Sequence, residues 1–113
     1  MRESLRDPSR LKHILESINN VNSFMVGKNI NELISDKMLF FAVVKNIEII
    51  GEAAYMLSKE FQDNHPLTPW KQIIRMRHIL VHGYFQIEPE QLYNVYTEDL
   101  PILLKQIKEY LKE

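Results

Sequence analysis

Residues 35–61 read SDKMLFFAVVKNIEIIGEAAYMLSKEF, and this stretch decides the fold because it is the most apolar long segment of the chain. The side chains of Ser35 and Asp36 can accept hydrogen bonds from the unpaired backbone N–H groups of a first helical turn. We therefore predict one long helix from this cap to about Phe61. Its core stripe consists of apolar residues at three- and four-residue spacing, namely Leu39, Phe40, Val43, Ile47, Ile50, Ala54 and Leu57.

Three further apolar residues of this helix, Phe41, Val44 and Ile49, fall outside the core stripe. A helix that is apolar on more than one side must bury the additional surface. In a chain of 113 residues, we expect that surface to pack against a second copy. The sequence therefore predicts a homodimer.

Helices are also predicted on both sides of this segment. Asp7-Pro8, with Asp7 as the cap, should start a helix that Gly27 ends, and residues 29–34 should form a short connection. Thr68-Pro69 should start a third helix with Trp70 as a core anchor, and Pro89 a last one. Pro101 removes a backbone donor and should kink that last helix near Glu98. The predicted fold is all-α, an antiparallel bundle of four to five helices in one domain over residues 1–113.

Composition limits the classes of function. The formal net charge of −1 and the isoelectric point near 6.4 argue against a broad nucleic-acid-binding surface, so any contact with RNA must be local. The chain has no cysteine, which excludes disulfides and thiol catalysis. It also has no uninterrupted apolar run of about 18 residues, so we expect no membrane segment and a cytoplasmic location.

A local cationic site is predicted in residues 75–84, which read RMRHILVHGY. Residues 64–87 contain Lys71, Arg75 and Arg77 but no aspartate or glutamate, so the local charge is +3. Two of the four histidines of the chain, His78 and His82, lie in the same stretch. The helix that carries them is expected to end at Gly83, because glycine accepts a left-handed cap conformation.

A metal site is one use of this stretch. His78 and His82 are four residues apart on a helix, a spacing that lets two imidazoles bind one metal ion. A third ligand would have to come from Glu52, His65 or Glu88, and no motif places one there. The neighbouring arginines would also repel a cation, so we expect no metal and no other cofactor.

RNA cleavage is the other use. The planar guanidinium of Arg77 suits a phosphate, and His82 can carry a proton near neutral pH. Together they could cleave RNA without a metal ion, because the 2′-hydroxyl of the substrate is itself the nucleophile. The two residues are about 140° apart around an ideal helix. They converge only if the helix ends or distorts near Gly83, or if a second subunit contributes.

Glu52 is a possible auxiliary residue of this site, together with Arg75 and His78. It lies in a row with Lys45 and Glu48 on the side of its helix opposite the core. That pattern favours a solvent-exposed row of charges.

The motifs resemble those of the HepT family of HEPN ribonuclease toxins over essentially the whole chain. The resemblance rests on Arg77-x4-His82-x-Tyr84 and on the upstream run IEIIGEAA at residues 47–54, followed by Pro69-Trp70 and Leu100-Pro101. It implies a homodimeric helical bundle in which Arg77 and His82 cleave RNA. His78 departs from the pattern, because many HEPN proteins have asparagine directly after the motif arginine.

The resemblance also implies regulation by a partner. An MntA-like nucleotidyltransferase antitoxin would add AMP groups to Tyr84, in a complex that could be a higher hetero-oligomer. DNA would not be a substrate. The alternative function is a non-catalytic helical partner that binds a nucleotidyltransferase, a nucleotide or RNA through the same patch.

Overall fold

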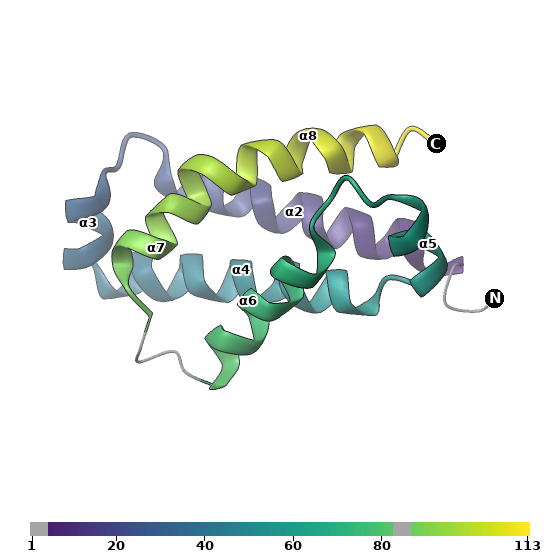
Figure 1. Cartoon of the computed structure of the whole chain (residues 1–113). Coiled ribbons are helices and arrows are strands. Elements are labelled where there is room, and N and C mark those ends of the chain that lie inside the picture. Colours follow the sequence, from purple (N-terminus) through teal and green to yellow (C-terminus); the bar gives the residue numbers. More distant parts are fainter. Residues whose placement is uncertain (1–4, 83–86) are drawn as a thin grey trace.

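The computed structural model describes residues 5–82 and 87–113, excluding the side chains of Val81 and His82, and every regular element in these ranges is helical. The long helices are α2 (Asp7–Met25), α4 (Lys37–Met56) and α6 (Trp70–His82). The C-terminal segment joins α7 (Pro89–Asn94), a π-helical turn η2 (Val95–Asp99) and α8 (Leu100–Tyr110). Two short helices, α3 (Ile30–Ser35) and α5 (Lys59–Asn64), lie at opposite ends of α4 (Figure 1). The predicted all-α class is confirmed.

Helices α2 and α4 form an antiparallel pair that runs along the molecule (Figure 1). Asp7, at the start of α2, contacts Ser58 just beyond the end of α4, and Asn20 near the end of α2 contacts Asn46 in the middle of α4. The segment from α7 to α8 runs opposite to α2 and packs on it, whereas α6 crosses α4 obliquely. The oblique crossing places the cationic end of α6 beside the outer surface of α4.

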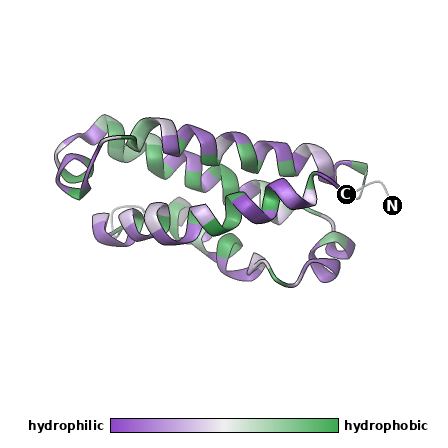
Figure 2. Ribbon diagram, turned by 90° about the horizontal axis from the view of Figure 1, so that it is seen from above, coloured by the Kyte–Doolittle hydropathy of each residue, from purple (hydrophilic) through white to green (hydrophobic). Residues whose placement is uncertain are grey.

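The core lies between α2, α4, α6 and α8. Figure 2 shows hydrophobic and hydrophilic residues alternating along the long helices, as expected where one side of each helix is buried. Six of the seven residues in the predicted stripe of α4 are buried, and Phe40 is half-buried against them. Trp70 is 5% exposed, so the predicted anchor of the third helix is confirmed.

The cap predicted for Asp7 is wrong. Asp7 is the first residue of α2 rather than its cap, and its side chain makes no capping hydrogen bond. Its buried carboxylate instead accepts hydrogen bonds from the backbone N–H of Ser58 at 2.8 Å and from the Ser58 hydroxyl at 2.6 Å. Asp7 therefore joins the start of α2 to the junction between α4 and α5. At the other end of α2, Gly27 has φ of +72°, which confirms the predicted stop.

The bounds predicted around α4 are correct at its start and wrong at its end. Asp36 caps α4 by accepting a hydrogen bond from the N–H of Leu39 at 3.1 Å. The helix stops at Met56 rather than Phe61, because Leu57 is extended and Ser58 caps the separate helix α5. The predicted connection at residues 29–34 contains α3, which begins with a reciprocal capping box between Asn29 and Glu32.

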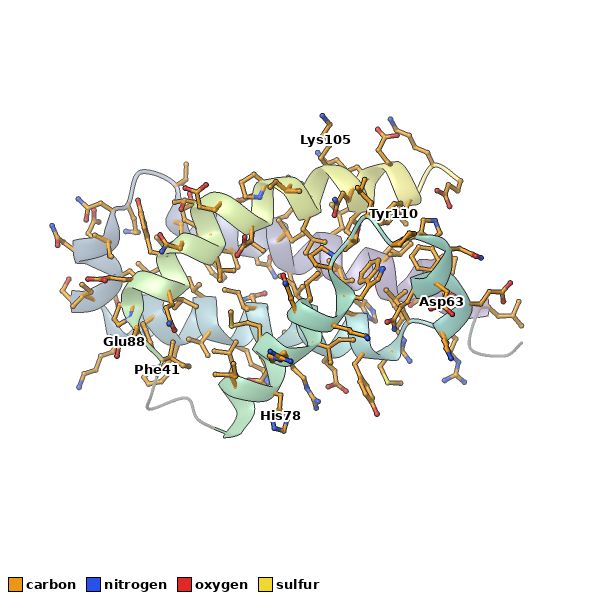
Figure 3. The ribbon with its side chains drawn as sticks, viewed as in Figure 1. Phe41, Asp63, His78, Glu88, Lys105 and Tyr110 are labelled. Carbon is orange, nitrogen blue, oxygen red and sulfur yellow. The ribbon has the colours of Figure 1, made fainter. Side chains whose placement is uncertain are left out.

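The three surplus apolar residues of α4 differ in how deeply they are buried. Val44 is only 6% exposed within the protomer, so its assignment to a surface outside the core is wrong. Ile49 is half-buried. Phe41 is 52% exposed and projects from the edge of the molecule (Figure 3). Of the three residues, Phe41 is therefore the one that presents a large apolar surface.

A kink was predicted near Glu98, and at that place the structure has the π-turn η2. Pro101 has no backbone N–H, so the carbonyl of Thr97 cannot accept the usual bond from the residue four positions later. The N–H of Leu100 bonds to the carbonyl of Val95, five residues earlier. The helix thus continues past the proline with one wide turn.

Candidate functional site

The crossing of α4 and α6 brings Gly51 against Arg77. A methyl group added at Gly51 would collide with Cβ of Arg77 and lie 3.1 Å from its Cα. Gly51 is buried, and only a residue without a side chain permits this approach. The position of Arg77 is therefore fixed by the packing of the two helix backbones.

Glu52, the residue after Gly51, forms an ion pair with Arg77. Oε2 of Glu52 lies 2.7 Å from Nη2 of Arg77, and the side chains of Glu52 and Arg77 are 50% and 30% exposed. The predicted charge row is therefore only partly correct: Lys45 pairs with Glu48 at 3.6 Å, whereas Glu52 pairs across the helix crossing. Glu52 joins Arg77 in one site.

Tyr55 completes this arrangement on the next turn of α4. Cζ of Arg77 lies 5.8 Å from the centroid of the Tyr55 ring, a distance typical of a cation–π contact. Nε of Arg77 is buried and has no hydrogen-bond partner among the described residues. The guanidinium is thus held from two sides by α4, while part of it stays accessible to solvent.

The other predicted site residues lie elsewhere on α6. Arg75 and His78 are exposed, and His78 projects from the lower end of the helix in Figure 3. His82 is the last residue of α6, so the helix extends over the whole Arg77-x4-His82 spacing. Its side chain is outside the described part of the chain, as are Gly83, the predicted helix end, and Tyr84, the predicted modified residue.

The start of α6 is held by the aromatic end of the molecule. The indole N–H of Trp70 donates to the carbonyl of His65 at 2.9 Å, and the ring lies beside Phe61 and Tyr110. The buried hydroxyl of Thr68 contacts the Tyr110 hydroxyl at 2.6 Å. These contacts fix the start of α6, and the approach of Arg77 to Gly51 fixes the helix further along.

A cavity of about 250 Å³ lies on another side of α6, between α4 and the η2–α8 segment. Its lining is mostly apolar and includes Ile47, Ile73 and Leu103 but neither Arg77 nor Glu52. Asp99 is one of the lining residues, although it is exposed. Burial raises the pKa of Asp99, and the neighbouring charge of Glu98 raises it further.

Within residues 5–82 and 87–113, side chains of the described set form no group of three or more potential metal ligands. No helix in that part of the chain is both long enough and apolar enough to cross a membrane.

The fold and the site define an all-helical protein that holds an oriented arginine at a helix crossing beside an exposed aromatic ring. The family model described as "Ribonuclease HepT-like" matches residues 14–110. The chain belongs to the HepT-like ribonuclease family, as the sequence motifs predicted.

Named relatives agree with this family. The chain is 39% identical over 98 residues to a protein of Methanocaldococcus jannaschii named as a putative RNase, covering 87% of this chain and 90% of that protein. It is 36% identical over 93 residues to a probable ribonuclease HepT of Thermococcus cleftensis, covering 82% and 84% of the two chains. A Caldanaerobacter subterraneus protein, also named as a putative RNase, is 36% identical over 91% of this chain and 92% of its own length. No solved structure matches the chain.

Gly51 and Tyr55 are site residues that the functional reading of the sequence missed. An isolated glycine within a strongly helical pattern is the signal for Gly51, because it indicates a close packing contact. Tyr55 carries no such signal, because its neighbour comes from another helix.

Proposed function

We propose that the chain is a metal-independent endoribonuclease in which Arg77 binds the scissile phosphate and His82 transfers a proton. The observation that carries this proposal is the placement of Arg77 by Gly51 and Glu52, in a chain of the HepT-like ribonuclease family. An arginine held on one edge keeps N–H donors for a phosphate on its accessible edge.

In the proposed reaction, the 2′-hydroxyl oxygen attacks the adjacent phosphorus while His82 accepts its proton. The bond from phosphorus to the 5′-oxygen of the next nucleotide then breaks, that oxygen takes up a proton from water, and His82 releases its own proton to water. Arg77 stabilises the charge that develops on the phosphorane. The products are a 2′,3′-cyclic phosphate and a 5′-hydroxyl, and DNA cannot react because it lacks the nucleophile.

Glu52 is a positioning residue in this proposal. Its carboxylate lies against Nη2 of Arg77, so in this proposal the phosphate binds N–H donors that Glu52 does not occupy. Glu52→Ala should lower kcat more than it raises KM, because it disturbs the orientation of the charge that acts in the transition state. Glu52→Gln keeps an acceptor for Nη2 and should restore much of the loss.

The active unit in this proposal is a homodimer. Three large apolar residues are exposed, namely Met38 and Phe41 on α4 and Ile79 on α6, at 84%, 52% and 47%. Their exposure supports an apolar interface near the end of α6. Two copies joined there would bring two Arg77–His82 pairs towards one cleft.

Regulation by an MntA-like nucleotidyltransferase antitoxin belongs to the same proposal. Its basis is the family and the Arg77-x4-His82-x-Tyr84 motif. AMP transferred to the Tyr84 hydroxyl would add a negative phosphodiester two residues from His82, and that charge would compete with RNA phosphates for Arg77.

Cleavage of RNA by the purified protein in EDTA tests the catalytic proposal. His82→Ala should lose at least about 10²-fold in rate, as expected for a missing acid–base group. Arg77→Ala should lose a similar factor, and Arg77→Lys should recover only part of it because lysine lacks the planar fork of donors. Full activity in both alanine variants, or cleavage that EDTA abolishes, would refute the mechanism. A wild-type chain that binds a nucleotidyltransferase but does not cleave RNA would favour the non-catalytic alternative.

A further inference from the structure

Tyr55 presents an aromatic surface that the packing of the protomer does not use. Its side chain is 59% exposed, although the residues on either side of it along the core stripe, Ala54 and Leu57, are buried. The guanidinium of Arg77 lies beside this ring, with its Cζ 5.8 Å from the ring centroid. The ring is therefore placed beside the proposed phosphate-binding cation, with more than half of its surface open to solvent.

The proposed dimer interface does not require Tyr55. Phe41 and Tyr55 lie in the same outward row of α4, but they are 14 positions apart, which corresponds to ~21 Å along a helix. Between them the row is charged, with Lys45, Glu48 and Glu52. A second copy centred on Phe41 would bury the apolar end of the row and leave the other end, with Tyr55, available.

A single-stranded RNA has the chemistry that fits both neighbours at once. Its phosphates are ligands for a guanidinium, and its bases stack on exposed aromatic rings whatever their sequence. Glu52 would repel a phosphate from the side of Nη2, so a bound phosphate would lie on another side of Arg77, whose Cζ is 5.8 Å from the centroid of the Tyr55 ring.

We propose that Tyr55 is a stacking platform for a nucleobase of the RNA, next to the phosphate that Arg77 binds. This proposal rests on the proposed ribonuclease function and adds a subsite to it. Tyr55 would supply binding to single-stranded substrate without selecting a sequence, because every base offers an aromatic face. Paired bases are already stacked within a duplex, so the subsite would favour unpaired RNA.

Binding rather than cleavage gives the direct test. A fluorescently labelled oligouridine RNA is titrated with the His82→Ala protein, in which cleavage is suppressed, and anisotropy reports the Kd. Adding Tyr55→Ala should raise the Kd about tenfold or more, the size expected for one lost stacking contact. Tyr55→Phe keeps the ring and should stay within about twofold of the parent. Phe24→Ala is the matched control, because Phe24 is an exposed aromatic residue on α2, at 37% exposure, away from Arg77.

An abasic nucleotide in the RNA identifies the contact. When the base that stacks on Tyr55 is removed from the probe, the Kd should rise by the same factor as in Tyr55→Ala. Combining the abasic probe with Tyr55→Ala should cost little more than either change alone. Additive losses at every position of the abasic nucleotide would overturn the proposal, as would an unchanged Kd in Tyr55→Ala.

Two further outcomes separate this inference from the proposals on which it rests. If the wild-type chain binds RNA through Tyr55 but does not cleave it, the ribonuclease proposal fails and the stacking subsite stands. If the wild type cleaves RNA and Tyr55→Ala binds it equally well, the subsite fails alone. Dissociation of Tyr55→Ala into monomers in sedimentation equilibrium would also overturn the subsite, because Tyr55 would then belong to the interface.

Discussion

Gly51 of α4 lies so close to Arg77 of α6 that no side chain fits between the two helices at that point. Gly51→Ala should therefore move α6 away from α4 and take Arg77 from its place beside Glu52. We expect a loss of stability of about 1–3 kcal/mol, the usual cost of overpacking, and a loss of RNA cleavage larger than the unfolded fraction explains. Urea unfolding and cleavage rates measure the two effects.

The control for Gly51→Ala removes the Arg77 side chain, which the added methyl group would strike. Arg77→Gly deletes the Cβ that the new methyl group would strike, although the backbone of Arg77 stays close. In a double-mutant cycle, the stability loss of the pair should be smaller than the sum of the two single losses. Simple additivity would mean that the crossing adjusts without strain.

Phe41 and Val44 should respond differently to a buried charge, although both were predicted from the sequence to lie outside the core. Phe41→Glu should give a folded monomer without RNA cleavage, because it places a carboxylate in the proposed interface, which should bury on the order of 1,200 Å². Val44→Glu should instead unfold the protomer, since Val44 is 6% exposed. Sedimentation equilibrium and circular dichroism measure the two outcomes. A Phe41→Glu dimer of wild-type strength would place the interface elsewhere.

Tyr84 should carry AMP after co-expression with a cognate nucleotidyltransferase. The intact mass of the protein should rise by one or more AMP units, and RNA cleavage should fall while the circular dichroism spectrum is unchanged. Tyr84→Phe should show neither the mass change nor the loss of cleavage. If a catalytically inactive nucleotidyltransferase neutralises Tyr84→Phe completely, inhibition works through binding alone.

Asp99 should make stability depend on pH in the direction opposite to an ion-paired carboxylate. Its pKa is higher in the folded chain than its ordinary value, so the folded state binds the proton more tightly. Stability from this group is complete at pH below the unfolded pKa and declines as pH rises through the folded pKa. Asp99→Asn should therefore stabilise the protein at neutral pH, by less than about 1 kcal/mol because water screens much of the side chain.

Thermal unfolding at several pH values checks this expectation. The advantage of Asp99→Asn should shrink as the pH is lowered, because Asp99 of the parent becomes protonated. Glu98→Gln removes the second cause of the shift and should give a smaller change in the same direction. A variant that is less stable than the parent at neutral pH would contradict the assignment.

Local patterns predicted the features that depend on a few consecutive residues. The cap at Asp36 and the stop at Gly27 follow from side chains and backbone groups within one or two helical turns. Pro101 indicated an irregular turn near Glu98, but a kink was predicted there and not the π-turn that the structure has. The capping box of α3 is equally local, and the spacing of Asn29 and Glu32 could have predicted it.

Long-range contacts account for the errors. The carboxylate of Asp7 would suit a cap, but its partner Ser58 lies 51 positions away and binds it with two hydrogen bonds. Glu52 follows a helical charge row, yet a buried crossing supplies Arg77 from another helix. Neither partner can be read from neighbouring residues, because each is brought close only by the packing of α4 with α2 or with α6.

The hydrogen bond between Asn20 and Asn46, and the one between Asp7 and Ser58 just beyond α4, also limit the rotation of α4 about its own axis. Consecutive residues of a helix are about 100° apart around its axis. A shift of α4 by one residue relative to α2 would therefore replace each residue that faces α2 by one that lies about 100° away. Such a slip would separate both polar pairs, which lie at different heights along the helices. The two pairs thus resist rotation of α4 and favour the orientation in which Gly51 faces α6 and Tyr55 faces outward.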